Sequence, residues 1–362
     1  MSARRSRIKK NPFNRKRIFG RRLIGIDLGT ANTVVFLDRR GIVLQEPSIL
    51  AVNERGRVVA VGRSAKEMVG KTPGDVYILH PLRDGVIADF ESTRSLLKHF
   101  ISSVHRPSAL GLRPTVLISI PSSTSQVERR AIEEAAIQAG AHQQVYLIEE
   151  PIAAAIGIGI DIAEPRGRMI VDIGGGTTDI AIISCGGVAV GQMIKTAGGS
   201  IDEAIRRSIR QRYNLLIGER MAEQIKIELG GALPPEECMR SLEVSGRDLA
   251  AGLPTRVTLT EQEVHSMIAA PLAEIVKAVC STIEQCPPEI LSDLFEEGMY
   301  LTGGGALIRG LDERLHRETG LPVQVAPNAM TAVAEGTGRA IMYLQRKKTA
   351  GSAWQKMAVN VR

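Results

Sequence analysis

Two stretches of this chain, Asp27–Thr33 (DLGTANT) and Asp172–Asp179 (DIGGGTTD), repeat one pattern. Each lies between two apolar runs, which predicts a strand, an Asp-apolar-Gly turn and a second strand. Glycine in such a turn adopts unusual backbone conformations and lets another group approach the backbone closely. The small hydroxyl residues that follow supply the N–H and O–H donors that phosphate requires. The repeat therefore predicts two similar half-molecules that clamp one phosphate chain between them.

Length and composition indicate a globular protein of two domains. The chain has 362 residues, of which 44% are hydrophobic and 23% are charged, so each domain can bury a core. Aromatic residues make up only 3%, which argues against a base-stacking surface for single-stranded nucleic acid. The four cysteines form no CxxC pair, so neither a zinc site nor a disulfide framework is indicated.

The basic charge is concentrated at the two ends of the chain. Residues 1–22 carry ten Lys or Arg and no acid, and residues 345–362 carry five and no acid. Removing these fifteen charges from the net charge of +7 leaves −8 for residues 23–344. The body of the protein therefore lacks a basic groove, and no specific nucleic-acid partner is expected.

The N-terminal segment has two interpretations. Ile8, Phe13, Ile18 and Phe19 lie among its basic residues, so it can anchor the protein to an anionic membrane surface. Each Lys or Arg near such a surface adds about 1 kcal/mol. Pro12 interrupts any long helix, which keeps a solvated arm as the second interpretation. A secretory signal is not expected, because no apolar core precedes a cleavage-like site.

The region after the basic tail has the pattern of an α/β protein. The apolar run Thr115–Ile120 predicts a central strand. Ser125 and Glu128 form a capping box for the next helix, whose expected inward face includes Val127. The strand Val145–Ile148 then completes a β-α-β unit.

The second half repeats this plan after its own hairpin. Helices are expected over Ile201–Tyr213 and Gly218–Leu229, and Thr260 is expected to cap a further helix. A separate long helix is expected to follow Pro271. The strand Gly298–Thr302 ends in a glycine-rich turn.

Acidic side chains stand where chemistry is expected. Asp27 and Asp172 cannot face phosphate directly, and a Mg²⁺ ion that keeps several waters would reconcile them with it. Glu149 and Glu150 lie where a strand ends and a helix begins, so a carboxylate here can orient or deprotonate a water that attacks the γ-phosphate. The alternative role for this carboxylate is favourable electrostatics at a helix N-terminus.

Two other segments each allow a binding role and a structural role. Glu223 and Lys226 share one helical face, so they can bracket a ribose or adenine or can form a surface ion pair. Gly303–Ala306 lets a base or phosphate approach the backbone, or forms a tight strand-to-helix turn. Gly198 and Gly199 directly precede an expected helix.

In this order, the motifs resemble those of the actin superfamily of ATPases and, more narrowly, the MreB family of bacterial actins. Pro81–Asp89 (PLRDGVIAD) is the most specific match, because other branches of the superfamily do not share it. The similarity covers about residues 23–344, and its motifs are Ile26–Thr33, Pro81–Asp89, Ile148–Gly157, Asp172–Thr178 and Leu301–Ala306.

The resemblance implies an α/β actin-like fold: two similar halves, each with a mixed sheet flanked by helices, four subdomains, and ATP with Mg²⁺ in the cleft. It gives Glu150 the position that activates the attacking water and Asp172 the position near the metal, with Asp27 also reaching the metal through water. The expected nucleotide-binding residues are Asp27, Gly29, Thr30, Ala31, Asn32, Gly174, Gly175, Gly176, Thr177, Thr178, Gly198, Gly199, Glu223, Gln224, Ile225, Lys226, Gly303, Gly304, Gly305 and Ala306.

The resemblance also suggests domain boundaries. Between a basic N-terminal tail and a basic C-terminal tail, it places two domains, each with a smaller subdomain, and a helix that returns to the first domain. The ranges are 1–22 for the first tail, 23–164 for domain I with its small subdomain at about 53–84, 165–327 for domain II with its small subdomain at about 201–291, 328–344 for the returning helix and 345–362 for the second tail.

The implied function is a slow ATPase coupled to polymerisation, in filaments that organise cell-wall synthesis and rod shape. Expected partners are further copies of the chain in paired protofilaments, membrane proteins of the cell-elongation machinery, and the inner face of the cytoplasmic membrane. The membrane contacts would come from the N-terminal tail and the loop with Leu110 and Leu112. The alternatives are a filament for plasmid segregation or organelle positioning, and, without polymerisation, a chaperone or sugar kinase of the same superfamily. A chaperone would need a substrate-binding domain after the last helix, where eighteen residues remain.

Overall fold

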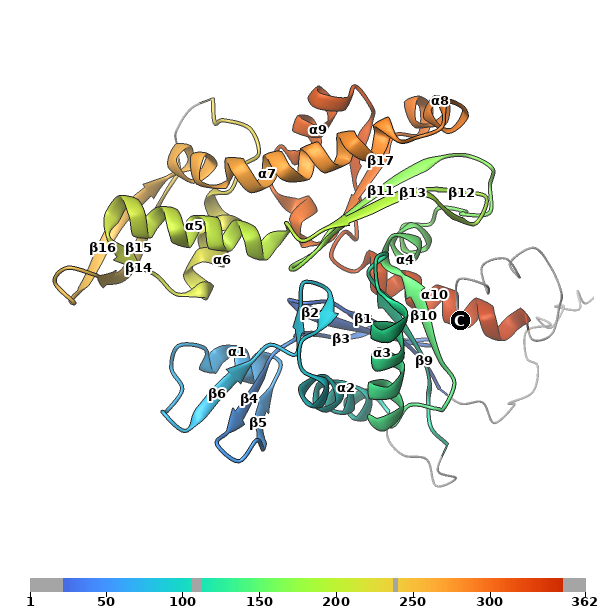
Figure 1. Ribbon diagram of the computed structural model, residues 1–362, viewed down its shortest axis with the longest axis horizontal. Helices are drawn as coiled ribbons and strands as arrows, with labels where there is room; N and C mark the ends of the chain where they lie inside the picture. Colours follow the sequence, from blue (N-terminus) through green and yellow to red (C-terminus); the bar gives the residue numbers. More distant parts are fainter. Residues whose placement is uncertain (1–21, 106–111, 237–239, 348–362) are drawn as a thin grey trace, which may run out of the picture.

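The computed structural model describes residues 22–105, 112–236 and 240–347. Two lobes face each other, with the first half of the chain forming one and most of the second half forming the other (Figure 1). The predicted membrane-contact residues 1–21 and Leu110, and most of the basic C-terminal tail, lie outside the described residues.

The two lobes contain five-stranded sheets with the same strand plan. In each, an antiparallel three-strand meander is joined through its first strand to two parallel strands. The first sheet has the order β10-β9-β1-β2-β3, with β1 Leu23–Leu28, β2 Asn32–Leu37, β3 Gly41–Pro47, β9 Thr115–Ile120 and β10 Val145–Glu149. The second has the order β13-β12-β11-β17-β18, with β11 Arg168–Ile173, β12 Thr178–Ser184, β13 Gly187–Ile194, β17 Met299–Thr302 and β18 Val323–Val325. The prediction of two similar halves, each with a mixed sheet, is confirmed.

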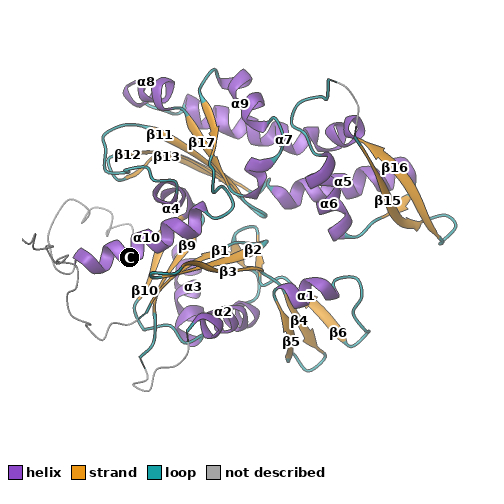
Figure 2. Ribbon diagram, turned by 180° about the vertical axis from the view of Figure 1, so that it is seen from behind, coloured by secondary structure: helices purple, strands orange, loops and turns teal. Residues whose placement is uncertain are grey.

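Helices cover the sheets, as Figure 2 shows from behind. They include α2 Phe90–Val104, α3 Gln126–Gln138, α5 Gly198–Tyr213, α8 Pro288–Glu297 and α9 Leu311–Thr319. The capping box of Ser125 and Glu128 starts α3 as predicted. The expectation for Val127 was wrong: its side chain is 78% exposed, because the first turn of α3 projects beyond the core and burial begins at Ile132.

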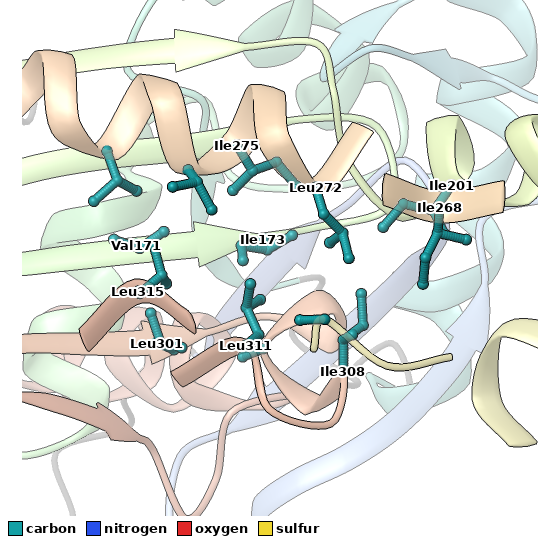
Figure 3. Close-up of a cluster of buried hydrophobic side chains, with 14 of the residues drawn as sticks. Val171, Ile173, Ile201, Ile268, Leu272, Ile275, Leu301, Ile308, Leu311 and Leu315 are labelled. Atoms are coloured by element: carbon teal, nitrogen blue, oxygen red, sulfur yellow. The ribbon is translucent and has the colours of Figure 1, made fainter. Parts of the chain in front are cut away.

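The longest helix, α7 Glu261–Glu284, begins at the predicted cap Thr260 but runs through Pro271 without a break. A proline inside a helix costs about 3 kcal/mol. Burial of neighbouring apolar residues such as Ile268 and Leu272 in the domain II core offsets that cost. Figure 3 shows this face of α7 packed over Val171, Leu301 and other core side chains.

Among the described residues, α7 is also the one helix that is long and apolar enough to cross a membrane, judged by length and composition. Ten of its side chains are buried in the protein, including Val264, Ile275 and Val279. All of the ten except Glu261 and Thr282 belong to the hydrophobic core of domain II, so α7 is a core helix here.

Each lobe carries a smaller sheet at its outer end. In the first lobe this sheet has the order β5-β4-β6, with β4 Leu50–Asn53, β5 Val58–Val61, β6 Val76–Leu79 and the helix α1 Arg63–Met68 beside it; a short hairpin, β7 Leu82–Arg83 and β8 Val86–Ile87, follows. In the second lobe the small sheet comprises β14 Leu215–Leu216, β15 Ser241–Asp248 and β16 Pro254–Thr260, with α6 Glu219–Leu229 nearby. These sheets give the molecule four parts, and the exact boundaries remain predictions.

Two helices cross where the lobes join, α4 Glu150–Gly157 and α10 Ala332–Lys347. Their backbones touch: a Cβ atom at Gly157 would overlap the Ala332 carbonyl, and one at Gly336 would overlap the Ala153 carbonyl. The predicted small-residue face of α4 therefore packs against α10, as well as against the sheet of domain II. This crossing is the mechanical connection between the two halves.

Because the α4 and α10 backbones touch, we expect one added methyl group at their crossing to lower the stability of the protein. Gly336→Ala places a Cβ into the backbone of α4, which cannot move aside as a flexible side chain would. We expect the unfolding temperature, followed by circular dichroism, to fall by at least about 3 °C. Gly74→Ala, at a position surrounded by open space, is the control. Equal unfolding temperatures for the two variants would contradict the close crossing.

Candidate functional site

The two predicted turns meet face to face. A Cβ at Gly175 would lie 2.5 Å from the Ala31 Cβ, and a Cβ at Gly176 would lie 2.6 Å from the Thr30 Oγ1. The second turn is held closed by the Gly174 amide, which donates to the Thr177 carbonyl at 2.9 Å. Any side chain at the two central glycines would push the halves apart.

A cavity of about 450 Å³ lies between the lobes at these turns. Most of the predicted binding residues line it, from both hairpins, from α5 and α6 and from the glycine turn after β17. They are Asp27, Gly29, Thr30, Ala31, Asn32, Glu150, Asp172, Gly174, Gly175, Gly176, Thr177, Gly198, Gly199, Glu223, Lys226, Gly303, Gly304 and Gly305.

Four predicted residues do not line the cavity. Thr178 is buried, and its hydroxyl donates to the Thr196 carbonyl at 2.7 Å. Gln224 is on the outer face of α6 and bonds to Glu228, whereas Ile225 and Ala306 are in the hydrophobic core. The helical period explains these positions in α6, because residues three apart share a face and the two between them do not.

A third turn, between β7 and β8, completes the wall. The Gly85 amide donates to the Thr30 Oγ1 at 3.0 Å, and Gly85 lines the cavity. A Cβ here would lie 2.7 Å from the Pro121 Cγ and 3.0 Å from the Thr177 Cγ2, so the tip is wedged between the two lobes. This turn belongs to the specific Pro81–Asp89 motif, for which sequence analysis offered no physical role.

Asp27, Glu150 and Asp172 line the inner end of the cavity, and a fourth carboxylate, Asp179, is buried close to them. Loss of hydration and the charge of Asp172 raise the pKa of Asp27 to about 7, although Ser119 donates a hydrogen bond to it at 3.1 Å. Burial raises the pKa of Asp172 despite a 2.6 Å hydrogen bond from Thr302. For Glu150, burial and the charges of Asp179, Asp172 and Asp27 together raise the pKa well above its usual range.

Asp179 is the member of this group that sequence analysis did not assign. Its Oδ1 accepts a hydrogen bond from the Ser122 amide at 2.8 Å, which joins β12 of domain II to the loop after β9 of domain I. Its Oδ2 is buried without a hydrogen-bond partner. Burial raises the pKa of Asp179 to about 7. Asp172 and Asp179 are the two end residues of the DIGGGTTD stretch and pair across the β11–β12 hairpin, and this placement at the two ends of the turn was the available signal.

This acidic group suits a hydrated divalent cation. The carboxylates repel one another, and the buried Asp179 Oδ2 has no hydrogen-bond partner. A positive charge that enters this group would reduce the repulsion and attract that oxygen. Among the described residues, no three His, Cys, Asp or Glu side chains converge closely enough to bind a metal directly. Mg²⁺ keeps several waters when it binds proteins. Contact through water from Asp27 and Asp172 would therefore agree both with the cluster of carboxylates and with the lack of a direct metal-binding group among the described residues.

The other end of the cavity is built by α5 and α6. Lys226 donates from its Nζ to the Gly198 carbonyl at 3.1 Å and to the Asp202 Oδ2 at 2.9 Å. Gly198 and Gly199 lie in the first turn of α5 and not before it, and their amides donate to the Gly174 and Gly175 carbonyls. These two amides fix the second glycine turn to α5 and are not free donors.

Exposed apolar side chains form the remaining wall. Ile227, Leu307 and Met330 line the cavity and are 71%, 55% and 47% exposed. Beside them, Gly303 has a φ of 79°, and a Cβ there would overlap the Ile173 carbonyl. Such a wall can cover the face of a flat aromatic ring. Sequence analysis missed these three residues because isolated surface apolar residues are common.

Two like halves that each bring a glycine turn to a shared cleft define an actin-like protein. The family model described as MreB/Mbl protein matches residues 21–349. The chain therefore belongs to the MreB/Mbl family, and the predicted resemblance is confirmed.

Individual relatives agree with this assignment. The chain is 50% identical over 323 residues to the cell shape-determining protein MreB of Escherichia coli (strain K12), covering 88% of this chain and 92% of that protein. It is 47% identical over 316 residues to the cell shape-determining protein Mbl of Bacillus subtilis (strain 168), covering 87% and 94%. The crystal structure of MreB 5 of Spiroplasma citri bound to AMPPNP matches with a TM-score of 0.86 and 37% identity, over 92% of this chain and 99% of that one.

The acidic group predicts that the nucleotide-free protein loses stability as pH rises. Because the pKa of Asp27 is about 7 in the folded state and 3.8 as its ordinary value, the folded state holds the extra proton between these values. The unfolding free energy should therefore decline from about pH 4 to about pH 7. Asp27→Asn, neutral throughout, should flatten this decline in denaturant titrations, whereas the exposed-site control Asp75→Asn should not. Parallel pH profiles for wild type and Asp27→Asn would contradict the interpretation.

Proposed function

We propose that this protein is an ATP-dependent bacterial actin whose membrane-associated filaments organise cell-wall synthesis and rod shape. The observation that carries the proposal is the meeting of two glycine turns at one cavity, in a chain 50% identical to a protein named for cell-shape determination. The relative from Spiroplasma citri has been crystallised with AMPPNP and with ADP. This supports an adenine nucleotide as the ligand of the cavity.

Each wall of the cavity suits one part of the nucleotide. The turns at Gly29–Asn32 and Gly174–Thr177 would bind the phosphates through backbone and hydroxyl donors. Glu223 and Lys226 would lie at the ribose, and the apolar wall with Gly303–Gly305 would cover the adenine. Mg²⁺, when bound near Asp27 and Asp172, would neutralise charge on the phosphates.

Glu150 is the proposed catalytic group. It begins α4 at the end of β10, lines the cavity, and is 8% exposed. Its raised pKa makes the ionised carboxylate a stronger proton acceptor than an exposed glutamate, and a bound cation would favour that ionised form, so Glu150 would orient and deprotonate the water that attacks the γ-phosphate. The neighbouring Glu149 instead forms an ion pair with Arg129 at 3.3 Å. Hydrolysis would be slow and would time filament disassembly.

The proposal extends to assembly, location and partners, for which family membership is the support. The proposal includes homopolymeric paired protofilaments on the inner face of the cytoplasmic membrane, together with membrane proteins of the elongation machinery. The ten basic residues of 1–22 support an anionic membrane surface as a partner. The family match across residues 21–349 favours cell shape over plasmid segregation, organelle positioning, a chaperone or a sugar kinase.

Removing the Glu150 carboxylate should separate nucleotide binding from hydrolysis. Glu150→Gln keeps the shape of the side chain but cannot take a proton, so phosphate release should fall about 100-fold while ATP affinity stays within a few-fold. Glu149→Gln, with phosphate release near the wild-type rate, is the matched control. Wild-type phosphate release by Glu150→Gln would remove Glu150 from the mechanism.

Deleting residues 1–22 should weaken membrane binding. The loss of ten positive charges should reduce co-sedimentation with vesicles that contain anionic lipid, and high salt should reduce wild-type binding in the same way. Vesicles of zwitterionic lipid alone serve as the control. If the truncated protein sediments as well as the full chain, the anchor lies elsewhere.

A further inference from the structure

One ion pair connects the two small subdomains across the cleft. The Lys66 Nζ, on α1, lies 2.7 Å from the Glu223 Oε2, on α6. Figure 1 shows α1 and α6 facing each other on the side of the molecule away from α10. Among the described residues this is the one ion pair between the subdomains that carry the small sheets. We call it the cross-cleft pair.

Both partners are fixed to their own lobes. The Arg63 amide, in the first turn of α1, donates to the Glu46 Oε2 at 2.6 Å, and Glu46 follows the cavity residue Gln45 on β3. On the other side, α6 is anchored in the core by buried residues such as Ile225. A change in the angle between the lobes must therefore stretch or break the cross-cleft pair.

The cross-cleft pair lies where it can resist opening of the cavity. The lobes are joined at the α4–α10 crossing, where Gly157 and Gly336 bring the two backbones into contact. The cross-cleft pair lies at the opposite side, where an opening rotation about that crossing produces the largest separation. Glu223 also lines the cavity, so the same carboxylate faces the ligand space and holds the opposing lobe.

We propose that Lys66 is a positioning residue that holds the cleft closed over the bound nucleotide and so limits the rate at which the nucleotide leaves. This inference rests on the proposed function, because it assigns a control of release to the nucleotide cavity. Lys66 itself does not line the cavity, and it acts through Glu223. Nucleotide departs when the pair separates and the small subdomains move apart.

The expected size of the effect is modest. The side chains of Lys66 and Glu223 are 38% and 39% exposed, so water and salt screen their attraction. Removing such a pair should speed release about 2- to 5-fold. Lys66→Glu places two like charges together and should speed release further than Lys66→Ala.

The test is the dissociation rate of fluorescently labelled ADP, chased with excess ATP, from the full chain with Mg²⁺ present. Protein is kept too dilute to assemble, as checked by light scattering. Lys66→Ala and Lys66→Glu are compared with wild type and with Lys71→Ala, which removes the same charge from an exposed position just beyond α1. Unchanged circular dichroism verifies that each variant is folded.

Salt provides a second readout that a merely structural role of Lys66 would not alter. Release from wild type and Lys71→Ala should accelerate with added KCl, and release from Lys66→Ala should already be fast and respond less. If both Lys66 variants release ADP at the wild-type rate, or show the wild-type salt response, the inference is overturned while nucleotide binding stands. Failure of the wild type to bind the labelled ADP would overturn the proposed function itself.

Discussion

The structure depends on the direct contact between two glycine turns that belong to different halves of the chain. Gly175 and Gly176 lie against Ala31 and Thr30 so closely that no side chain fits at either glycine. This contact determines where the cavity lies, because each turn ends a hairpin at the inner edge of its own sheet. A ligand that binds both turns therefore binds both lobes at once.

The same contact creates an electrostatic cost. It brings carboxylates from both lobes into one poorly hydrated space, where burial and mutual repulsion raise their pKa values. In the proposed nucleotide complex, the cation bound with the phosphates would supply the missing positive charge at the inner end, and the cross-cleft pair spans the outer end. With the α4–α10 crossing as the connection, we propose that ligand occupancy sets the angle between the lobes and that this angle controls assembly.

The sequence predicted the hairpins and most cavity residues, because glycine turns and their flanking strands are local features. The sequence was less informative about features that depend on tertiary packing, such as the continuity of a helix, the exposure of one side chain and a contact between distant residues. Pro271 stays inside a helix because buried neighbours on both sides hold it there. Val127 is exposed because the end of α3 projects beyond the core. Lys66 is 157 positions from its partner, and no local pattern identifies such a pair.

In the proposed function, nucleotide bound between the two turns controls a membrane-bound filament. Electron microscopy of the purified full chain with anionic vesicles, in the presence and absence of Mg²⁺ and ATP, tests it most directly. We expect paired filaments lying on the vesicles with Mg²⁺ and ATP, and dispersed protein without nucleotide. Dispersed protein under both conditions, or identical filaments under both, would contradict it.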